Sequence, residues 1–206
     1  MKYRLLSFCM AVLLLISMIS VPRIEAANST ETFKDSADTK IVKLLEALGL
    51  MEIDSETGFF WDEMPVKRSE LAKIICKMFN ISETKDASPH FTDVSDYDRA
   101  YIETAIRNGY MSGYDNEKFG PDDYVTNIQL IKTFVTALGG DAAAQSQGGY
   151  PGGYITIGNM LGLLKGKAVA NENISRRIDV ANIIYTALHA CLLYTSDAAD
   201  EARSVD

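Results

Sequence analysis

Residues 101–113 are the most informative part of the sequence, because their pattern occurs more than once along the chain. Its sequence is Tyr101-Ile-Glu-Thr-Ala-Ile-Arg-Asn-Gly109-Tyr-Met-Ser-Gly113, and 53 residues later it aligns without a gap on Tyr154-Ile-Thr-Ile-Gly-Asn-Met-Leu-Gly162-Leu-Leu-Lys-Gly166. An earlier copy, Ile41-Val-Lys-Leu-Leu-Glu-Ala-Leu-Gly49-Leu-Met, keeps the apolar spacing and the glycine. Each copy predicts a short helix with a left-handed C-cap, because a glycine followed by an apolar residue is typical of one.

A second element repeats together with the first. Phe60-Trp-Asp-Glu-Met-Pro-Val-Lys-Arg-Ser-Glu70 aligns without gaps on Phe119-Gly-Pro-Asp-Asp-Tyr-Val-Thr-Asn-Ile-Gln129, and Ile174-Ser-Arg-Arg-Ile-Asp179 is a third copy with one residue of slippage. Apolar residues follow each copy at positions i, i+3, i+4 and i+7, the pattern of a helix that is buried on one face. Each repeat therefore predicts a helix–loop–helix unit.

The repeats predict how the chain is organised. One helix pair cannot bury its apolar stripe alone, but three pairs packed together form a shared core. We therefore predict an all-α fold with repeats at residues 33–80, 91–139 and 150–190. The polar residues 82–90 predict a connection between the first two repeats, and the glycine-rich residues 140–149 predict a flexible linker before the third.

The two ends of the chain differ from the repeats. Lys2 and Arg4 precede an uncharged apolar stretch that ends in small residues near Ala26, which predicts a secretory signal peptide at residues 1–26. A permanent membrane anchor is the alternative, although the stretch is short for one. Residues 191–206 match no part of the repeat and resemble a translated sequencing adapter, so we predict a non-native tail. We expect a secreted protein without stable membrane insertion after cleavage of the signal.

Composition limits the classes of function. The chain has 20 Lys and Arg against 28 Asp and Glu, and removing Lys2, Arg4, Arg23 and Glu25 with the signal leaves 17 basic and 27 acidic side chains, a net charge of −10. Such a chain is not expected to bind nucleic acid, since duplex binding needs clustered Lys and Arg. Two histidines and scattered cysteines predict no metal centre and no cofactor. A non-catalytic binding module is favoured, and an enzyme would have to lie beyond residue 190.

The second repeat carries a family signature. Its motifs are Phe91-Thr-Asp93-Val94, then Tyr97, then Gly109-Tyr-Met-Ser-Gly113-Tyr114, and then Phe119-Gly-Pro121 followed by Val125-Thr126. This pattern resembles an S-layer homology repeat, and Phe33-Lys-Asp35 opens the first repeat in the same way. The resemblance covers about residues 33–190. It implies a pseudo-threefold helical bundle that holds secreted proteins on the bacterial cell wall or cell surface.

The resemblance also implies a ligand and its binding residues. In the family, an arginine in the Thr-Arg-Ala-Glu motif and the backbone around the turn glycines line grooves for a pyruvylated secondary cell-wall polysaccharide. On this chain the implied ligand-binding positions are Arg68, Arg177, Lys67, Arg176, Gly113, Gly166, Tyr97, Asp93 and Asp35. A peptidoglycan-linked glycan is a further candidate partner. A packing role is the alternative for Tyr97.

The arginine position has a physical argument of its own. It falls in the first turn of a helix, where a cation opposes the helix dipole and costs about 0.3–1 kcal/mol. Arg68 and Arg177 occupy it beside Lys67 and Arg176, which favours an anion site at the exposed amides of the helix start. The second repeat has Asn127 there, so its groove is expected to be weak, while Thr126 and Gln129 predict a capping box.

Other readings of these residues are weaker. The acidic runs near Asp93 and Asp115 lack the spacing of a calcium-binding loop, and acidic pairs in short turns lack the cleft of a glycosidase. The main rival is a degenerate scaffold for protein–protein contacts or surface-layer self-assembly without glycan binding.

Overall fold

The computed structural model describes residues 39–81, 91–165 and 172–189. The predicted signal peptide, the connection at 82–90, the tail at 191–206 and the site candidates Asp35 and Gly166 lie outside them. The labelled helices are α2 (Thr39–Ala47), α3 (Arg68–Met78), α4 (Asp96–Arg107), α5 (Asn127–Ala137), α6 (Asp141–Ser146) and α7 (Gly152–Met160). A further helix covers residues 177–189.

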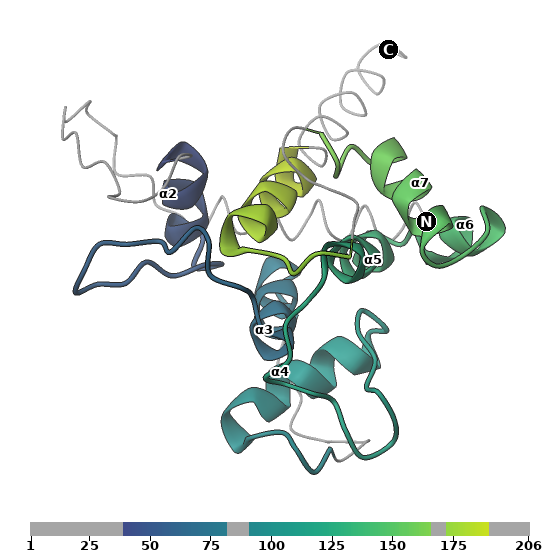
Figure 1. Ribbon diagram of the computed structural model, residues 1–206, viewed down its shortest axis with the longest axis horizontal. Helices are drawn as coiled ribbons and strands as arrows, with labels where there is room; N and C mark the ends of the chain where they lie inside the picture. Colours follow the sequence, from purple (N-terminus) through teal and green to yellow (C-terminus); the bar gives the residue numbers. More distant parts are fainter. Residues whose placement is uncertain (1–38, 82–90, 166–171, 190–206) are drawn as a thin grey trace, which may run out of the picture.

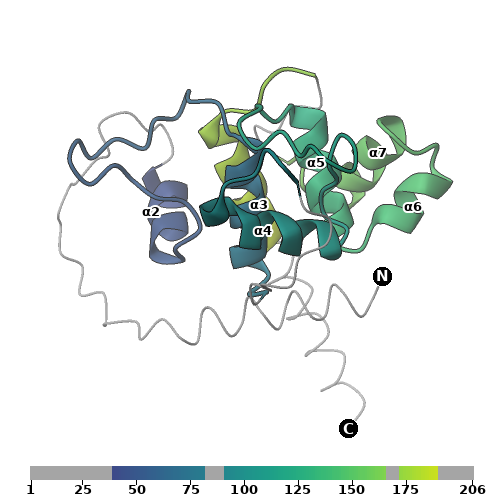
Figure 2. The same ribbon diagram turned by 90° about the horizontal axis from the view of Figure 1, so that it is seen from below.

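Helices α2 and α3 lie within the predicted repeat at 33–80, α4 and α5 within the one at 91–139, and α7 and the helix at 177–189 within the one at 150–190. Figure 1 shows the second helix of each pair near the centre, with α2, α4 and α7 outside them. α3 packs against α4 of the next repeat, and α5 packs against α7 of the one after it. In both views, α2 and the α6–α7 pair lie at opposite ends of the molecule (Figures 1 and 2).

The C-caps of the outer helices are confirmed as predicted. Gly49, Gly109 and Gly162 all have positive φ, between 64° and 77°. After α4, the Tyr110 amide donates to the Ala105 carbonyl at 2.9 Å and the Gly109 amide to the Ile106 carbonyl at 2.8 Å, which is the Schellman pattern. The same pair of hydrogen bonds follows α2 and α7. These ends turn each chain segment back toward the core.

A closed ring of backbone hydrogen bonds joins the three repeats just before their inner helices. The Val66 amide donates to the Ser175 carbonyl (3.0 Å), the Ser175 amide to the Val125 carbonyl (2.7 Å), and the Val125 amide to the Val66 carbonyl (3.0 Å). All three side chains are buried. Because these pairings are isolated bridges, the described residues contain no named strand, and the all-α prediction is confirmed. The pseudo-threefold arrangement stays a prediction, which this ring supports.

The core is continuous across the repeats. Its largest fully buried side chains are Tyr154, Phe60, Phe119, Phe134, Leu45, Leu71, Ile75, Met78, Ile102, Leu130 and Ile131, and they come from all three repeats. A shared core is expected, because each helix pair has an apolar stripe that it can bury only against the other pairs.

The prediction of a flexible linker at residues 140–149 needs correction. Helix α6 lies within this segment and packs against α7. Its sequence, Asp-Ala-Ala-Ala-Gln-Ser, combines an acidic first residue with good helix formers. Gly153, just beyond the segment, allows the close approach, since a Cβ there would lie 2.0 Å from the Ala144 carbonyl oxygen. Residues 141–146 therefore form a packed helix in place of the predicted flexible linker, and Gly153 permits its close contact with α7.

Candidate functional site

Arg68 is the first residue of α3, and its side chain reaches into the loops of the second repeat. Its Nε donates to the Phe119 carbonyl at 3.1 Å and its Nη2 to the Ser112 carbonyl at 2.7 Å. The guanidinium carbon lies 4.5 Å from the centre of the Phe119 ring and 4.8 Å from that of Tyr114. Arg68 is only 7% exposed. The loops thus hold this cation in one fixed position.

Burial lowers the pKa of Arg68, while the nearby Tyr114, Asp123 and Asp93 act in the opposite direction. The usual pKa of a guanidinium lies so far above neutral pH that Arg68 stays charged here. The hydrogen bonds from Nε and Nη2 go to neutral carbonyl groups rather than to a carboxylate. The carbonyl groups therefore hold the Arg68 guanidinium in place without neutralising its positive charge.

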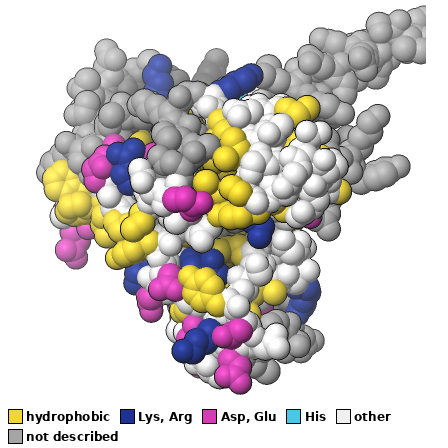
Figure 3. Space-filling view, turned by 45° about the vertical axis from the view of Figure 1, so that its right-hand side comes forward, with side chains coloured by type: hydrophobic (Ala, Val, Ile, Leu, Met, Phe, Trp, Pro, Cys, Tyr) yellow, Lys and Arg dark blue, Asp and Glu magenta, His cyan; other side chains and the backbone are white. Residues whose placement is uncertain are grey.

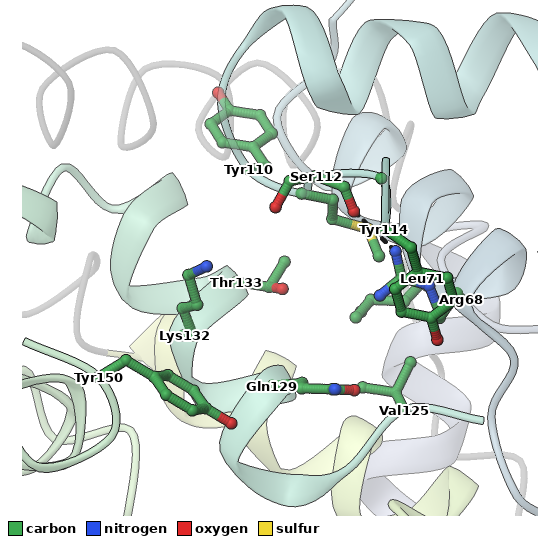
Figure 4. A pocket seen from close by; sticks show the side chains of 12 residues that line it. Arg68, Leu71, Tyr110, Ser112, Tyr114, Val125, Gln129, Lys132, Thr133 and Tyr150 are labelled. Atoms are coloured by element: carbon green, nitrogen blue, oxygen red, sulfur yellow. Dashed lines mark hydrogen bonds between the residues drawn. The ribbon is translucent and has the colours of Figure 1, made fainter. Parts of the chain in front are cut away.

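The Arg68 groove is a cavity of about 280 Å³ beside this guanidinium. Its walls come from α3, the turn at 110–114, α5 and the loop before α7, as Figure 4 shows. The lining residues are Arg68, Leu71, Tyr110, Met111, Ser112, Gly113, Tyr114, Val125, Gln129, Lys132, Thr133 and Tyr150. Arg68 and Lys132 are the charged members of this set, and the set includes no carboxylate. The cavity therefore suits an anion.

Two of the predicted site residues shape the loops around Arg68. The Asp93 carboxylate accepts hydrogen bonds from the amides of Phe119 (3.0 Å) and Gly120 (2.8 Å). Although partial burial opposes it, these two amides keep the pKa of Asp93 below its usual value. Gly113 lines the cavity, and a Cβ there would lie 2.5 Å from the Phe91 ring and 2.9 Å from two carbonyl oxygens.

Arg177 makes the matching contacts with the first repeat. Its Nε donates to the Phe60 carbonyl at 2.8 Å and its Nη2 to the Glu52 carbonyl at 2.7 Å, and it lies 4.7 Å from the centre of the Phe60 ring. Unlike Arg68, it also forms an ion pair, with Nη1 2.7 Å from Glu70 Oε1. The hollow beside it, of about 530 Å³, is the Arg177 groove, lined by Glu52, Ile53, Asp54, Ser55, Glu56, Trp61, Met64 and Arg177.

The remaining predicted cations are paired with acidic side chains. Lys67 lies 2.7 Å from Asp122, and this contact raises the pKa of Lys67. Arg176 pairs with Asp179 and with Glu63, which raise its pKa. Neither Lys67 nor Arg176 lines the Arg68 groove or the Arg177 groove.

Tyr97 is 72% exposed and accepts a hydrogen bond from Lys73 Nζ at 3.2 Å, away from both sets of lining residues. Asp35 and Gly166 lie outside the described residues. The structure thus brings Arg68 and Gly113 together at one groove, with Asp93 supporting its wall, and places Arg177 at the other.

The sequence argument missed the residues that α5 and the following loop contribute. Lys132, Thr133 and Tyr150 line the Arg68 groove, with Gln129 beside them. The signal was present in the repeat alignment, because Gln129 aligns with Glu70, and Lys132, three residues later, with Lys73. Positions three apart lie on the same face of a helix, so one groove residue at 129 implies another at 132.

Two general findings concern the part of the chain that the structure describes. It contains no cluster of three or more His, Cys, Asp or Glu side chains placed to hold a metal ion. Within the same residues, every helix is too short or too polar to cross a bilayer.

Comparison with known proteins confirms the resemblance seen in the sequence. Residues 90–130 match the model of the S-layer homology domain. The chain is 24% identical to "Middle cell wall protein" of Brevibacillus brevis over 184 residues, which cover 87% of this chain and 17% of that protein. It is 28% identical to "Surface layer protein" of Brevibacillus choshinensis over 162 residues, 75% of this chain and 14% of that protein. The chain thus spans less than a fifth of either relative.

Proposed function

We propose that this chain is a non-catalytic module that anchors a secreted protein to the bacterial cell wall by binding an anionic, pyruvylated secondary cell-wall polysaccharide in the Arg68 groove. Support for the general role comes from the match of residues 90–130 to the S-layer homology domain and from the two Brevibacillus relatives, named as a cell wall protein and a surface layer protein.

The observation that carries the proposal is the charge of the Arg68 groove. On a chain with a net charge of −8, the groove collects two cations and no carboxylate among its lining residues. Arg68 is held by carbonyl groups and is 7% exposed, so it would lose little further side-chain freedom when a ligand binds. A guanidinium in such a fixed position suits a carboxylate such as that of a pyruvate ketal.

The rim of the groove adds a reason to expect a sugar. Tyr114 and Tyr150 line it and remain 60% and 49% exposed. An aromatic ring with one face available to solvent offers flat apolar contact together with a polar hydroxyl group. The groove thus suits a glycan that carries an acidic group. Its negatively charged substituent would lie at Arg68 and Lys132, and its sugar ring would lie against a tyrosine.

The face in Figure 3 bears on the rival scaffold role. Its hydrophobic side chains form separate groups that are divided by charged and other polar atoms. Obligate protein–protein interfaces are large and more apolar than the rest of the surface. The described part of this face does not present such a continuous apolar patch.

The test is a sedimentation assay of the secreted chain with purified cell-wall polymer, in its native form and after removal of pyruvate by mild acid. We expect retention only on the pyruvylated polymer. Arg68→Ala should weaken retention at least tenfold, since a charge-assisted hydrogen bond contributes about 1.5–3 kcal/mol. Arg107→Ala, which removes the same side chain from the exposed end of α4, is the matched control.

Two results would count against the proposal. Equal retention on polymer with and without pyruvate would reject recognition of the anionic group. Concentration-dependent self-association without any retention would favour the scaffold role instead.

A further inference from the structure

The Arg68 groove and the Arg177 groove are built on the same backbone frame. In each, an arginine at the start of an inner helix donates Nε to the carbonyl of a phenylalanine, Phe119 or Phe60, and Nη2 to the carbonyl three residues after the C-cap glycine of the outer helix. The two arginines also stack on those same phenylalanine rings, at 4.5 and 4.7 Å. Differences in ligand binding must therefore come from the side chains around the frame.

The first difference lies at one aligned position of the neighbouring inner helix. Beside Arg177 this position is Glu70, which does not line the Arg177 groove but whose carboxylate accepts a hydrogen bond from Arg177 Nη1 at 2.7 Å. In the Arg68 groove it is Gln129, a neutral side chain that lines the cavity. The Gln129 side chain is also turned back to its own helix start, where its Oε1 accepts from the Thr126 amide at 3.2 Å. Only Arg177 thus carries an internal counter-ion at this position.

The second difference lies one helical turn further along. Lys132 lines the Arg68 groove, where its ammonium group lies 6.0 Å from the centre of the Tyr154 ring. The aligned Lys73 is engaged, because it donates to the Tyr97 hydroxyl at 3.2 Å and lies 3.8 Å from Glu52. Burial lowers the pKa of Lys73, but the Tyr97 hydrogen bond and Glu52 outweigh it, so the net shift is upward. Lys132 thus lines the Arg68 groove, while Lys73 contacts Tyr97 and Glu52 and does not line the Arg177 groove.

The third difference is the charge of the lining. The residues around the Arg177 groove include Glu52, Asp54 and Glu56 against Arg177, whereas the Arg68 groove has its two cations and no carboxylate in its lining. An anion would be repelled at the Arg177 groove and attracted at the Arg68 groove. Charges within a few ångströms of a partly buried site change affinity by an order of magnitude or more.

We propose, on the basis of the proposed function, that the residue pair Gln129 and Lys132 makes the Arg68 groove competent for an anionic ligand, and that Glu70 and Glu52 keep the Arg177 groove closed to anions. Lys132 is the second cationic contact of the ligand. Gln129 acts by not supplying the counter-ion that Glu70 supplies to Arg177. The two grooves thus differ in ligand class although their arginines make the same backbone contacts.

The experiment is isothermal titration of the secreted chain with a methyl hexoside that carries a 4,6-pyruvate ketal, and with its uncharged methyl ester. The wild type should bind the acid and not the ester. Lys132→Met should weaken binding of the acid roughly tenfold, while Lys73→Met at the aligned position should leave it unchanged. Gln129→Glu should weaken it by a similar factor, because it places a carboxylate at the cavity wall.

A gain-of-function variant tests the closed groove directly. Glu52→Gln combined with Glu70→Gln gives the Arg177 groove the neutral side chains that the Arg68 groove has at these positions. The number of acid molecules bound per chain should then rise by one, and with Lys132→Met added, which weakens the Arg68 groove, the new site should be the tighter of the two. Thermal unfolding of every variant checks that it is folded, and Lys132→Met decides the question if Gln129→Glu does not fold.

The outcomes separate the two proposals. If the wild type binds neither compound, the proposed function fails and this inference falls with it. If the wild type binds the acid but Lys73→Met and Lys132→Met weaken binding equally, the grooves are equivalent and only this inference is overturned. Unchanged binding in both Gln129→Glu and Lys132→Met would overturn it in the same way.

Discussion

Arg68 and Arg177 occupy the same place in two repeats but different electrostatic surroundings. Arg68 is bound by two carbonyl groups between aromatic rings, whereas Arg177 has the matching carbonyl contacts and an ion pair with Glu70. The comparison shows that an arginine at this position has a structural task before any ligand arrives. It joins its own inner helix to the loops of another repeat.

This structural task changes the expected effect of removing the arginine. The sequence argument counts only the cost of a cation at a helix start, about 0.3–1 kcal/mol. The structure adds hydrogen bonds from a charged donor, which contribute about 1.5–3 kcal/mol each when they are buried. The hydrogen bonds outweigh the dipole, so the arginine stabilises the fold.

The largest predicted effect follows from this balance. Arg68→Ala should lower the free energy of unfolding by about 2 kcal/mol, because it leaves the buried Phe119 carbonyl and the partly buried Ser112 carbonyl without their donor. Arg177→Ala should cost about half as much, because its side chain and that of Glu70 are more exposed. Urea denaturation of both variants measures the difference. Losses below about 0.5 kcal/mol in both would show that water replaces the guanidinium at no cost.

The turn at Gly113 provides the next test. Gly113→Ala should destabilise the protein by about 1–3 kcal/mol through overpacking, because the new Cβ would meet the Phe91 ring and two carbonyl oxygens. The first repeat has Ile53 at the aligned position, so the tight turn distinguishes the Arg68 groove from the Arg177 groove. Gly152→Ala is the matched control, since a Cβ there meets nothing within 4 Å and its thermal midpoint should not fall.

The two labelled inner helices differ in how they begin, which predicts a smaller effect. α5 begins with the capping box of Thr126 and Gln129, as the sequence predicts, whereas α3 follows Lys67 without a side-chain cap. Thr126→Ala should cost about 1 kcal/mol. Lys67→Ala should leave the thermal midpoint unchanged at moderate salt, since its ion pair with Asp122 is exposed. An equal loss in both variants would contradict this difference.

The smallest effect concerns the acid dependence of the Phe119 loop. The pKa of Asp93 is lowered in the folded state, so its contribution to stability is present above the unfolded value near 4 and is lost as pH falls through the lower folded value. Asp93→Asn should melt below the wild type at pH 7, and the gap should close between pH 5 and pH 2. A gap that stays constant with pH would show that the carboxylate charge plays no part.

Local features of the fold could be predicted because they depend on neighbours in sequence. The glycine C-caps and the capping box of α5 are examples. The repeat alignment also places Trp61 opposite Gly120, and both of these residues adopt positive φ. The glycine-rich segment could not be predicted in the same way. Whether a glycine gives freedom or close packing depends on what lies against it, and for Gly153 that is the backbone of α6.

The helices, their ends and the resemblance to the S-layer homology domain could be predicted from residue patterns, because apolar spacing and caps act within a few residues. The sequence also identified Arg68 and Arg177 as unusual cations. Which cations form ion pairs depends on contacts between distant parts of the chain, since Glu70 lies 107 positions from Arg177 and Asp122 lies 55 from Lys67. Coulomb attraction depends on distance in space, and the closed ring of the three repeats sets that distance.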